Sequence, residues 1–329
     1  MNCPNIIMRA LLSLAVLIPL LFISGCVIPG TDLEIPIISD LFGPHKEEFR
    51  HDVIVISGIQ AIPSHTVRSG QSLTFRVYVQ NLQKPESEPQ EDVEVELYDD
   101  CGIFEVRKGV CSGGEFDGTR KCKLKKMYPR STAIIDWRLT SNPVKIKTSC
   151  DVGVLVRYKY TTHTTSSVSF VNQEEYENLV AQGKQFSEKG TIIVGEGPVK
   201  SYIEVPDQPI MIDIRGGRSG EEAGKGMMSF WVENKGHGEL EKNRIDYKDI
   251  TIDCGDQVVG CDSCKKRIDQ EKGLVLIGRS SPKYSCEIYL RNPQFITQEK
   301  TYQLTSKITY SYKFSKKYKL TVEPEIELG

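Results

Sequence analysis

The chain lacks an excess of charge of either sign, because 42 lysine and arginine residues face 44 aspartate and glutamate residues, a formal net charge of -2 at pH 7. It therefore has no bulk positive field that would attract phosphates, and we expect no nucleic-acid partner. Glycine is too infrequent for a collagen, with 27 in 329 residues, and the 39% of hydrophobic residues is too high for a disordered chain. The composition is that of a globular protein of about two domains.

The sequence also has few residues in patterns typical of catalysis. No Gly-x-Ser-x-Gly motif and no lone nucleophilic cysteine occurs. The glycine-rich stretch 216–226 resembles a phosphate-binding loop, but Gly226 stands where that loop needs a serine or threonine, so we expect a hairpin loop there. The five histidines are scattered and form no pattern typical of a metal site or a catalytic base: His45, His51, His65, His163 and His237. We therefore expect no enzymatic activity, no cofactor and no metal.

A single long apolar run lies at the N-terminus, where Arg9 precedes an uncharged stretch from Ala10 to Ile23 that ends in Ser-Gly-Cys26. This layout is typical of an export signal, and its end resembles a lipobox. The resemblance implies that residues 1–25 are a signal peptide and that Cys26 becomes the lipid-modified N-terminus. The alternative is an uncleaved transmembrane anchor, because the run is about long enough to span a bilayer, although Pro19 interrupts it.

Residues 26–49 contain prolines and glycines without a sustained hydrophobic period, so we expect a lipid-anchored spacer. An apolar patch within residues 35–42 would pack on the first domain or rest at the membrane interface. Either form of anchor places the rest of the chain outside the cytoplasm, attached to a membrane.

The rest of the sequence contains an internal repeat at an offset of about 152 residues. Three landmarks keep their order: 75–81 aligns with 228–234, 100–102 with 253–255, and 157–160 with 309–312. We therefore expect two copies of one domain, at 50–194 and 198–325, joined by a glycine-containing linker.

Apolar and polar residues alternate within each copy, the pattern of strands with one buried face. The residues that should face inward are Val152, Val154, Val156, Tyr158 and Tyr160 in the first copy and Ile308, Tyr310, Tyr312 and Phe314 in the second. A second alternating run, Leu73, Phe75, Val77 and Val79, matches Met228, Phe230 and Val232 of the second copy. Turn residues at intervals near ten predict an all-β protein of two tandem Ig-like antiparallel β-sandwiches. One exception is a short helix near 173–183, where Asn172 is a candidate N-cap.

Short sandwich repeats behind a lipid anchor resemble the Ig-like (CARDB-like) modules of bacterial and archaeal surface proteins. The resemblance covers residues 50–325, but its glycine-rich signature after a strand-end asparagine occurs only in Asn234-Lys-Gly-His-Gly238. Copy one departs from that signature at 81–85. Such modules serve as spacers, adhesins and binding domains alike, so the resemblance implies a fold and not a ligand.

Eight of the ten cysteines remain after Cys3 and Cys26, four in each copy: Cys101, Cys111, Cys122, Cys150, Cys254, Cys261, Cys264 and Cys286. This even split predicts two disulfides per domain in an oxidising compartment. We expect Cys101 to pair with Cys111 or Cys122, and the same scheme in copy two. The alternative is zinc, because two cysteines separated by two residues have the spacing of a metal knuckle that the other two of copy two would complete. A thioredoxin-type site is less suitable, because no helix is expected after that pair.

Two charged clusters have alternative interpretations. The stretch Lys121–Lys126 is densely basic, and it predicts either a charged edge strand or a surface that binds an acidic polymer. Asp99 and Asp100 form an acidic turn, which is more typical of a solvated loop than of a calcium site.

Together these features predict a membrane-tethered extracytoplasmic lipoprotein with a structural, adhesive or binding role at the cell surface. Its partners would be the membrane, through Cys26, and a surface polymer or protein. The alternative is a subunit of a surface filament assembled by strand exchange.

Overall fold

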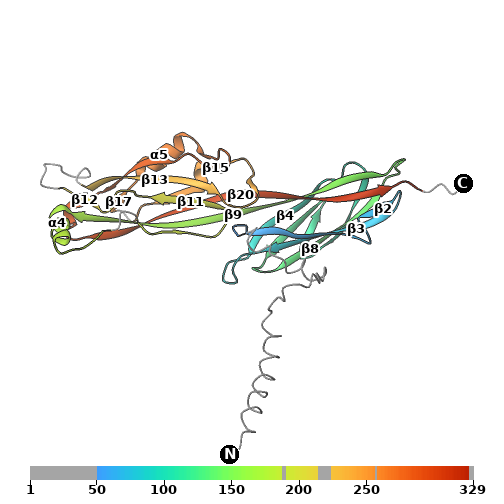
Figure 1. Ribbon diagram of the computed structural model, residues 1–329, viewed down its shortest axis with the longest axis horizontal. Helices are drawn as coiled ribbons and strands as arrows, with labels where there is room; N and C mark the ends of the chain where they lie inside the picture. The colour runs from blue at the N-terminus through green and yellow to red at the C-terminus, as the bar shows by residue number, and fades with distance from the viewer. Residues whose placement is uncertain (1–49, 187–189, 214–223, 256–257, 326–329) are drawn as a thin grey trace, which may run out of the picture. The chain divides into compact units, whose positions relative to one another are not determined.

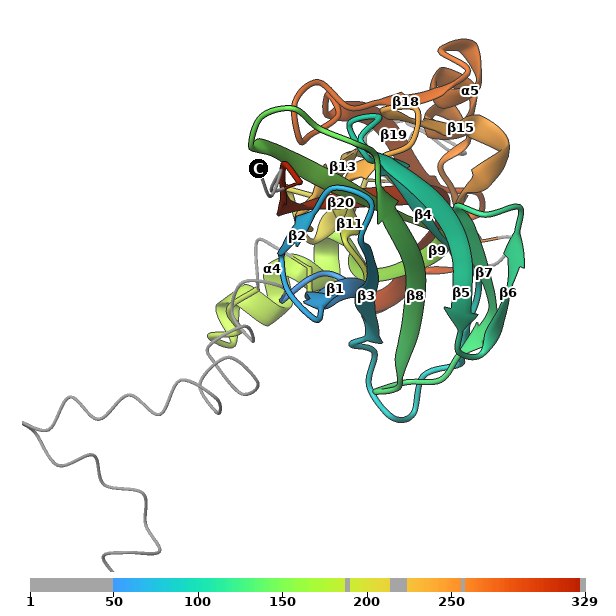
Figure 2. The same ribbon diagram turned by 90° about the vertical axis from the view of Figure 1, so that its right-hand side faces the viewer.

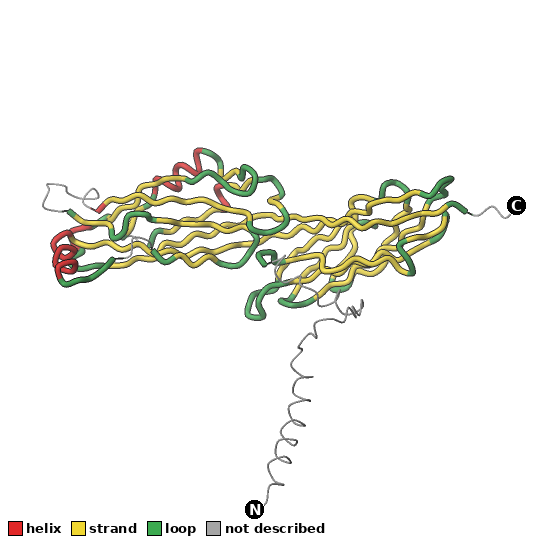
Figure 3. Tube along the Cα trace, viewed as in Figure 1, coloured by secondary structure: helices red, strands yellow, loops and turns green. Residues whose placement is uncertain are grey.

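The computed structural model describes residues 50–186, 190–213, 224–255 and 258–325, and strands dominate it (Figure 3). The expected signal peptide, the spacer, Cys26 and most of the glycine-rich stretch 216–226 lie outside these residues. The strands are β1 (Ile54–Ile62), β2 (Thr66–Arg68), β3 (Ser72–Asn81), β4 (Gln90–Asp99), β5 (Phe104–Cys111), β6 (Gly114–Asp117), β7 (Lys121–Met127), β8 (Thr132–Ser141), β9 (Thr148–Asn172), β10 (Ile192–Val194), β11 (Val199–Glu204), β12 (Ile210–Ile212), β13 (Lys225–Asn234), β14 (Glu239–Leu240), β15 (Arg244–Asp246), β16 (Ile250–Asp253), β17 (Val259–Gly260), β18 (Gly273–Val275), β19 (Tyr284–Leu290) and β20 (Lys300–Glu323). The α-helices are α4 (Gln173–Ala181) and α5 (Asp262–Gln270).

The first sandwich packs the sheet β1-β3-β8-β5 against strands β20, β9, β4, β7 and β6 of a larger sheet (Figure 2). Its core is filled from both sheets, because Phe75 of β3 meets Tyr318 of β20 and Phe116 of β6 meets Trp137 of β8, both edge to face. Trp137 and Phe75 are fully buried. The packing of two antiparallel layers over an apolar core confirms the predicted sandwich class.

The second sandwich packs the sheet β11-β13-β19-β17 against other parts of the same two long strands, β9 and β20. Val199 of β11 donates its backbone N–H to the hydroxyl of Tyr310 on β20, at 3.1 Å. Ser201 of β11 contacts both long strands through the hydroxyls of Thr164 and Ser306, at 3.0 and 2.9 Å.

Strands β9 and β20 form one antiparallel ladder that runs through both sandwiches (Figure 1). It extends from Lys300 opposite Phe170 to Val322 opposite Thr148, roughly 75 Å at the rise of an antiparallel strand. The expected domains, 50–194 and 198–325, are consecutive along the chain. In the ladder, however, the end of β9 lies in the second sandwich and the end of β20 lies in the first. Residues 49–329 accordingly form one compact unit.

The predicted alternation is correct at the strands that make the core. The inward residues of β9, β20, β3 and its repeat equivalent β13 are buried: Val152, Val154, Val156, Tyr158, Ile308, Tyr310, Tyr312, Leu73, Phe75, Val77, Val79, Met228, Phe230 and Val232. Tyr160 and Phe314, which were also predicted to face inward, are only partly buried. Strands β3 and β13 occupy equivalent central positions in their sheets, and the aligned segments near 157–160 and 309–312 are paired, with Tyr160 opposite Tyr310.

One helix was predicted and the other was not. Helix α4 follows the first copy as expected, and the Asn172 side chain caps it by accepting the backbone N–H of Glu174 at 3.0 Å. Helix α5 contradicts the expectation that nothing helical follows the cysteine pair of copy two. It buries only Cys264 and Ile268, so its apolar stripe is too short to be recognised by periodicity. Within the ranges described, no helix is long and apolar enough to cross a bilayer.

Candidate functional site

All eight cysteines that follow Cys26 lie in disulfides, two in each sequence copy. The predicted scheme is wrong in copy one, where Cys101 pairs with Cys150, and correct in copy two, where the equivalent Cys254 pairs with Cys261. The pairs are Cys101–Cys150, Cys111–Cys122, Cys254–Cys261 and Cys264–Cys286. The pairing is nested in copy one and sequential in copy two, so it does not repeat.

Sheet neighbours explain the pairing in copy one. Cys101 follows β4, which pairs with β9, and this brings it to Cys150 of β9 with 5.9 Å between their Cα atoms. Cys111 of β5 and Cys122 of β7 belong to opposite layers, so their bridge links the two sheets of the first sandwich.

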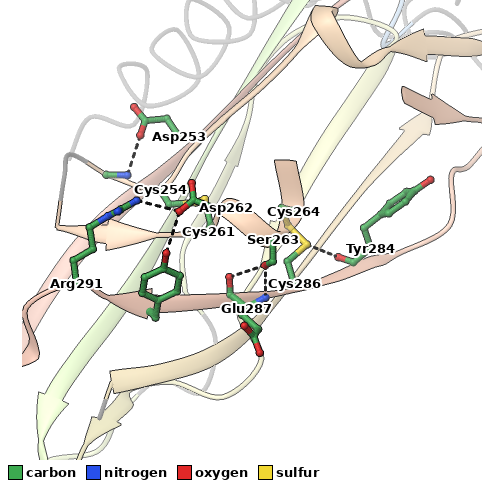
Figure 4. Close-up of a disulfide and its surroundings, with 12 residues drawn as sticks. Asp253, Cys254, Cys261, Asp262, Ser263, Cys264, Tyr284, Cys286, Glu287 and Arg291 are labelled. Carbon is green, nitrogen blue, oxygen red and sulfur yellow. Dashed lines mark hydrogen bonds and ion pairs between the residues drawn. A yellow bond between two sulfur atoms is a disulfide. The ribbon is translucent and has the colours of Figure 1, made fainter. Parts of the chain in front are cut away.

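In copy two, the two cysteines that are separated by two residues, Cys261 and Cys264, form disulfides with different partners. Cys261 binds the preceding loop cysteine, while Cys264 turns with α5 toward β19 and binds Cys286 (Figure 4). The four sulfurs are therefore used in two bridges, which argues against the zinc alternative. Among the described residues, no group of histidine, cysteine and acidic side chains is arranged to hold a metal ion.

A candidate binding site among the described residues is a groove of about 1410 Å³ where the two sandwiches meet. We call it the junction groove. Its walls come from the loop before β4, from β4 and β7, from the middle of β9, and from the region where β14 meets β20. It is lined by Gln83, Ser87, Glu88, Pro89, Gln90, Glu91, Asp92, Glu94, Lys121, Lys126, Arg157, Tyr158, Lys159, Tyr160, Thr161, His163, Glu241 and Ser311.

Arg157 is the most constrained charge in the junction groove. Its guanidinium donates to Glu94 at 2.8 Å and to Glu96 at 2.5 Å, and it lies 3.9 Å from Glu241. Partial burial acts to lower the pKa of Arg157, but the hydrogen bonds and charges of Glu96 and Glu94 raise it overall. This network fixes one wall of the groove and leaves the arginine fully charged.

The basic stretch 121–126 is not an edge strand, contrary to one of its two predicted interpretations. Strand β7 pairs with β4 on one side and β6 on the other, so β6 forms the edge. Cross-strand acids contact most of its lysines: Lys121 contacts Glu94 at 3.2 Å, Lys125 contacts Glu115 at 2.8 Å, and Lys126 contacts Glu91 at 3.4 Å. The patch is largely neutralised, which weakens the argument that it binds an acidic polymer.

The floor of the junction groove is polar, and it includes one uncompensated charge. Lys159, Thr161 and His163 alternate along the outward face of β9. Lys159 is exposed and has no ion pair within the described part of the chain, although its backbone carbonyl accepts the Gln90 side chain at 2.7 Å. The floor therefore offers a cation, a hydroxyl and an imidazole to a ligand, without converging on a reactive centre.

A buried carboxylate beside this groove joins the two sequence copies. Asp52, at the start of the first copy, accepts the backbone N–H of His237 at 3.1 Å and contacts its ring Nδ1 at 2.7 Å. Its side chain is only 3% exposed. Gly236 has no room for a Cβ, which would meet Asp52 and the Tyr312 hydroxyl, so this loop requires glycine.

The glycine-containing loop 234–238 therefore connects the second copy to Asp52 of the first copy. The Asn234 side chain accepts the Gly236 N–H and the Tyr312 hydroxyl, both at 3.1 Å, and Arg279 donates to two backbone carbonyls of the loop. Burial, with the nearby charge of Asp52, raises the pKa of Tyr312 well above its ordinary value. The signature Asn234–Gly238 found in the sequence thus lies in a loop that holds the two copies together.

Sequence reasoning missed the two ion-paired centres at the junction. Glu94, Glu96 and Arg157 lie at outward positions of alternating strands, so they could have been proposed as a cross-strand network once β4 and β9 were paired. Asp52 and His237 are 185 residues apart, and nothing local in the sequence relates them. The acidic turn also has ordinary partners, because Asp99 and Asp100 accept backbone N–H groups of the turn and Asp100 binds Arg120 at 2.7 Å.

No protein-family model matches the sequence, and no curated protein matches it. Among solved structures, the chain is similar to ACE of Enterococcus faecalis, described as binding its ligands by the collagen hug model. The two share 8% identity, with a TM-score of 0.21, over 84% of this chain and 96% of that chain. It is also similar to the collagen adhesin CNA of S. aureus, at 9% identity and a TM-score of 0.15, over 83% of this chain and 93% of that chain. Similarities at this level carry no conclusion about what the chain binds.

Proposed function

We propose that this chain is a membrane-tethered extracytoplasmic lipoprotein with a structural or binding role at the cell surface and no catalytic activity. The observation that carries the proposal is the pairing of all eight cysteines after Cys26. Disulfides persist outside the reducing cytosol, and an export signal that ends in a lipobox would deliver the chain there.

The junction groove supports a binding role within this proposal. It is open, its lining is mostly polar, and its charges are held in place by a network that both sandwiches contribute to. A ladder shared by both halves keeps the walls in a fixed relation, which lowers the cost of ordering a site on binding. These features suit an extended polar ligand such as a surface polysaccharide.

Lipid attachment is tested by metabolic labelling with a lipid probe. The Cys26→Ser variant should take up no label and should accumulate as unprocessed precursor, because the sulfur that receives the lipid is gone. Cys3→Ser is the matched control and should be labelled and processed normally. Unchanged mobility and unchanged membrane retention of Cys26→Ser would instead favour the plain transmembrane anchor.

Groove binding is tested with the full chain in detergent micelles and a panel of neutral and anionic surface polysaccharides. Lys159→Glu should weaken the binding of any polysaccharide that occupies the junction groove, by about fivefold, because it reverses an uncompensated charge on the floor. Lys248→Glu makes the same change at an exposed position outside the groove lining and should leave binding unchanged. Equal effects of the two variants would contradict a site in the groove.

The filament alternative makes a different prediction about assembly. Size-exclusion chromatography of a soluble fragment that begins near Phe49 should show a monomer or small oligomer. Open-ended polymers that grow with concentration would favour a filament subunit.

A further inference from the structure

Strand β20 has a gap in its pairing on the side away from β9. Three short strands pair with that side: β16 at residues 305–308, β14 at 312–313 and β2 at 321–323. Residues 314–320 lie between them, and within the described ranges no strand pairs with this side of the segment. We call this segment the edge slot. It is about seven residues long, roughly 24 Å, and is bounded by a paired strand at each end.

The edge slot is exposed and positively charged. Ser315, Lys316, Lys317 and Lys319 are exposed, and in the described part of the chain none of the three lysines forms an ion pair. Lys313, just before the slot, is by contrast paired with Glu239 of β14 at 3.1 Å. The slot therefore combines unpaired backbone hydrogen-bonding groups with an uncompensated positive charge.

Lysines on an exposed strand edge ordinarily prevent pairing between identical edges, and here they would repel a second copy of the same slot. The same charges attract a strand of opposite sign. Main-chain hydrogen bonds would supply the affinity of such an added strand, and its acidic side chains would supply selectivity. On the inward side of the slot, Tyr318 packs on Phe75 and Leu320 is buried. An added strand therefore need not cover these apolar side chains.

We propose that the edge slot binds an extended acidic peptide segment of a partner protein, which adds to β20 as a further strand of the large sheet. The bounded length of the slot restricts pairing to about seven residues. This surface is distinct from the junction groove, and the proposal does not depend on the lipid anchor.

The first test measures fluorescence anisotropy of a labelled nine-residue peptide of alternating glutamate and valine, with the full chain in detergent micelles. The triple variant Lys316→Glu, Lys317→Glu, Lys319→Glu should weaken binding by about tenfold or more, because three attractive contacts become repulsive. The control variant makes the same change of charge at three exposed lysines at and after α5, positions 265, 266 and 272, which form no ion pair with any residue that the structure describes. It should bind the peptide as the unaltered chain does.

The second test distinguishes strand addition from simple charge attraction. Two versions of the peptide carry N-methyl groups on alternate residues, one on the odd and one on the even positions. Only one set of N–H groups can point toward β20, so one version should lose binding and the other should keep it.

Three results of the peptide experiments would overturn the proposal. These are no measurable binding of the acidic peptide, equal binding of both methylated versions, or equal competition by polygalacturonate, which has the charge but no peptide backbone. Concentration-dependent polymers of the chain alone would show that the slot pairs with another copy, and this would also overturn it.

Discussion

A substitution in β20, late in the sequence, should destabilise the first sandwich. Leu320 is fully buried and lies opposite Cys150 in the ladder, within the first sandwich. Its strand segment is the last to be described along the chain, yet it closes the layer that faces β3 and β8. Leu320→Ala removes this side chain and leaves the backbone pairing with β9 in place.

The expected cost follows from the burial of the side chain. Truncation of leucine to alanine removes about three carbon groups, or about 2.4 kcal/mol of transfer free energy, and the cavity that remains brings the loss to about 3 kcal/mol. A loss of that size lowers the ratio of folded to unfolded protein about a hundredfold. Ile288 of β19 is equally buried in the second sandwich, so Ile288→Ala is the matched control.

Hydrogen exchange measured by mass spectrometry assigns the effect to a half of the molecule. Leu320→Ala should raise exchange in β3 and β8 first, and Ile288→Ala should raise it in β13 and β11 first. If Leu320→Ala raised exchange only in β11, β13 and β19, residues 198–325 would behave as a separate domain, and the argument from the shared ladder would be refuted.

Two further predictions concern the bridges and the response to alkali. Replacing both cysteines of Cys101–Cys150 by serine should lower the free energy of unfolding by about 4 kcal/mol, and the same change at Cys111–Cys122 by about 3 kcal/mol, because the first closes a span of 49 residues and the second a span of 11; urea titrations that give the reverse order would contradict this. Burial, with the hydrogen bond to a glutamate, raises the pKa of Tyr284 to about 12, so the folded state holds that proton more tightly than the unfolded state does. Stability should therefore be fully present below pH 10 and decline as the pH rises from about 10 to about 12, and Tyr284→Phe should make the decline less steep in urea titrations at each pH.

Local patterns in the sequence were enough to predict the fold class. The alternation in 73–79 and 152–158 identified buried faces, because a strand with one face in a core must alternate with a period of two. The N-cap at Asn172 identified helix α4 for an equally local reason. These features depend on neighbours within a few residues, which a single sequence contains.

The features that required tertiary structure could not be predicted in the same way. The disulfide partner of Cys101 depends on which strands become neighbours, and the spacing of cysteines does not specify that. The contact of Asp52 with His237 joins one residue of each copy, 185 positions apart, and could not be predicted for the same reason. The interpretation of stretch 121–126 as an edge failed because β6, a strand of only four residues, pairs with residues 121–124.

The length of β9 and β20 accounts for both the junction groove and the edge slot. Strands are ordinarily about five or six residues long, whereas β9 has 25 and β20 has 24, so each must leave one sandwich and enter the next. The short strands β14 and β2 each pair with only two or three residues of β20, and neither reaches residues 314–320. A strand shared in this way necessarily exposes part of its edge, and an uncovered edge requires charge to prevent aggregation. The three lysines at 316, 317 and 319 meet that requirement, and the same charge makes the edge selective for an acidic strand.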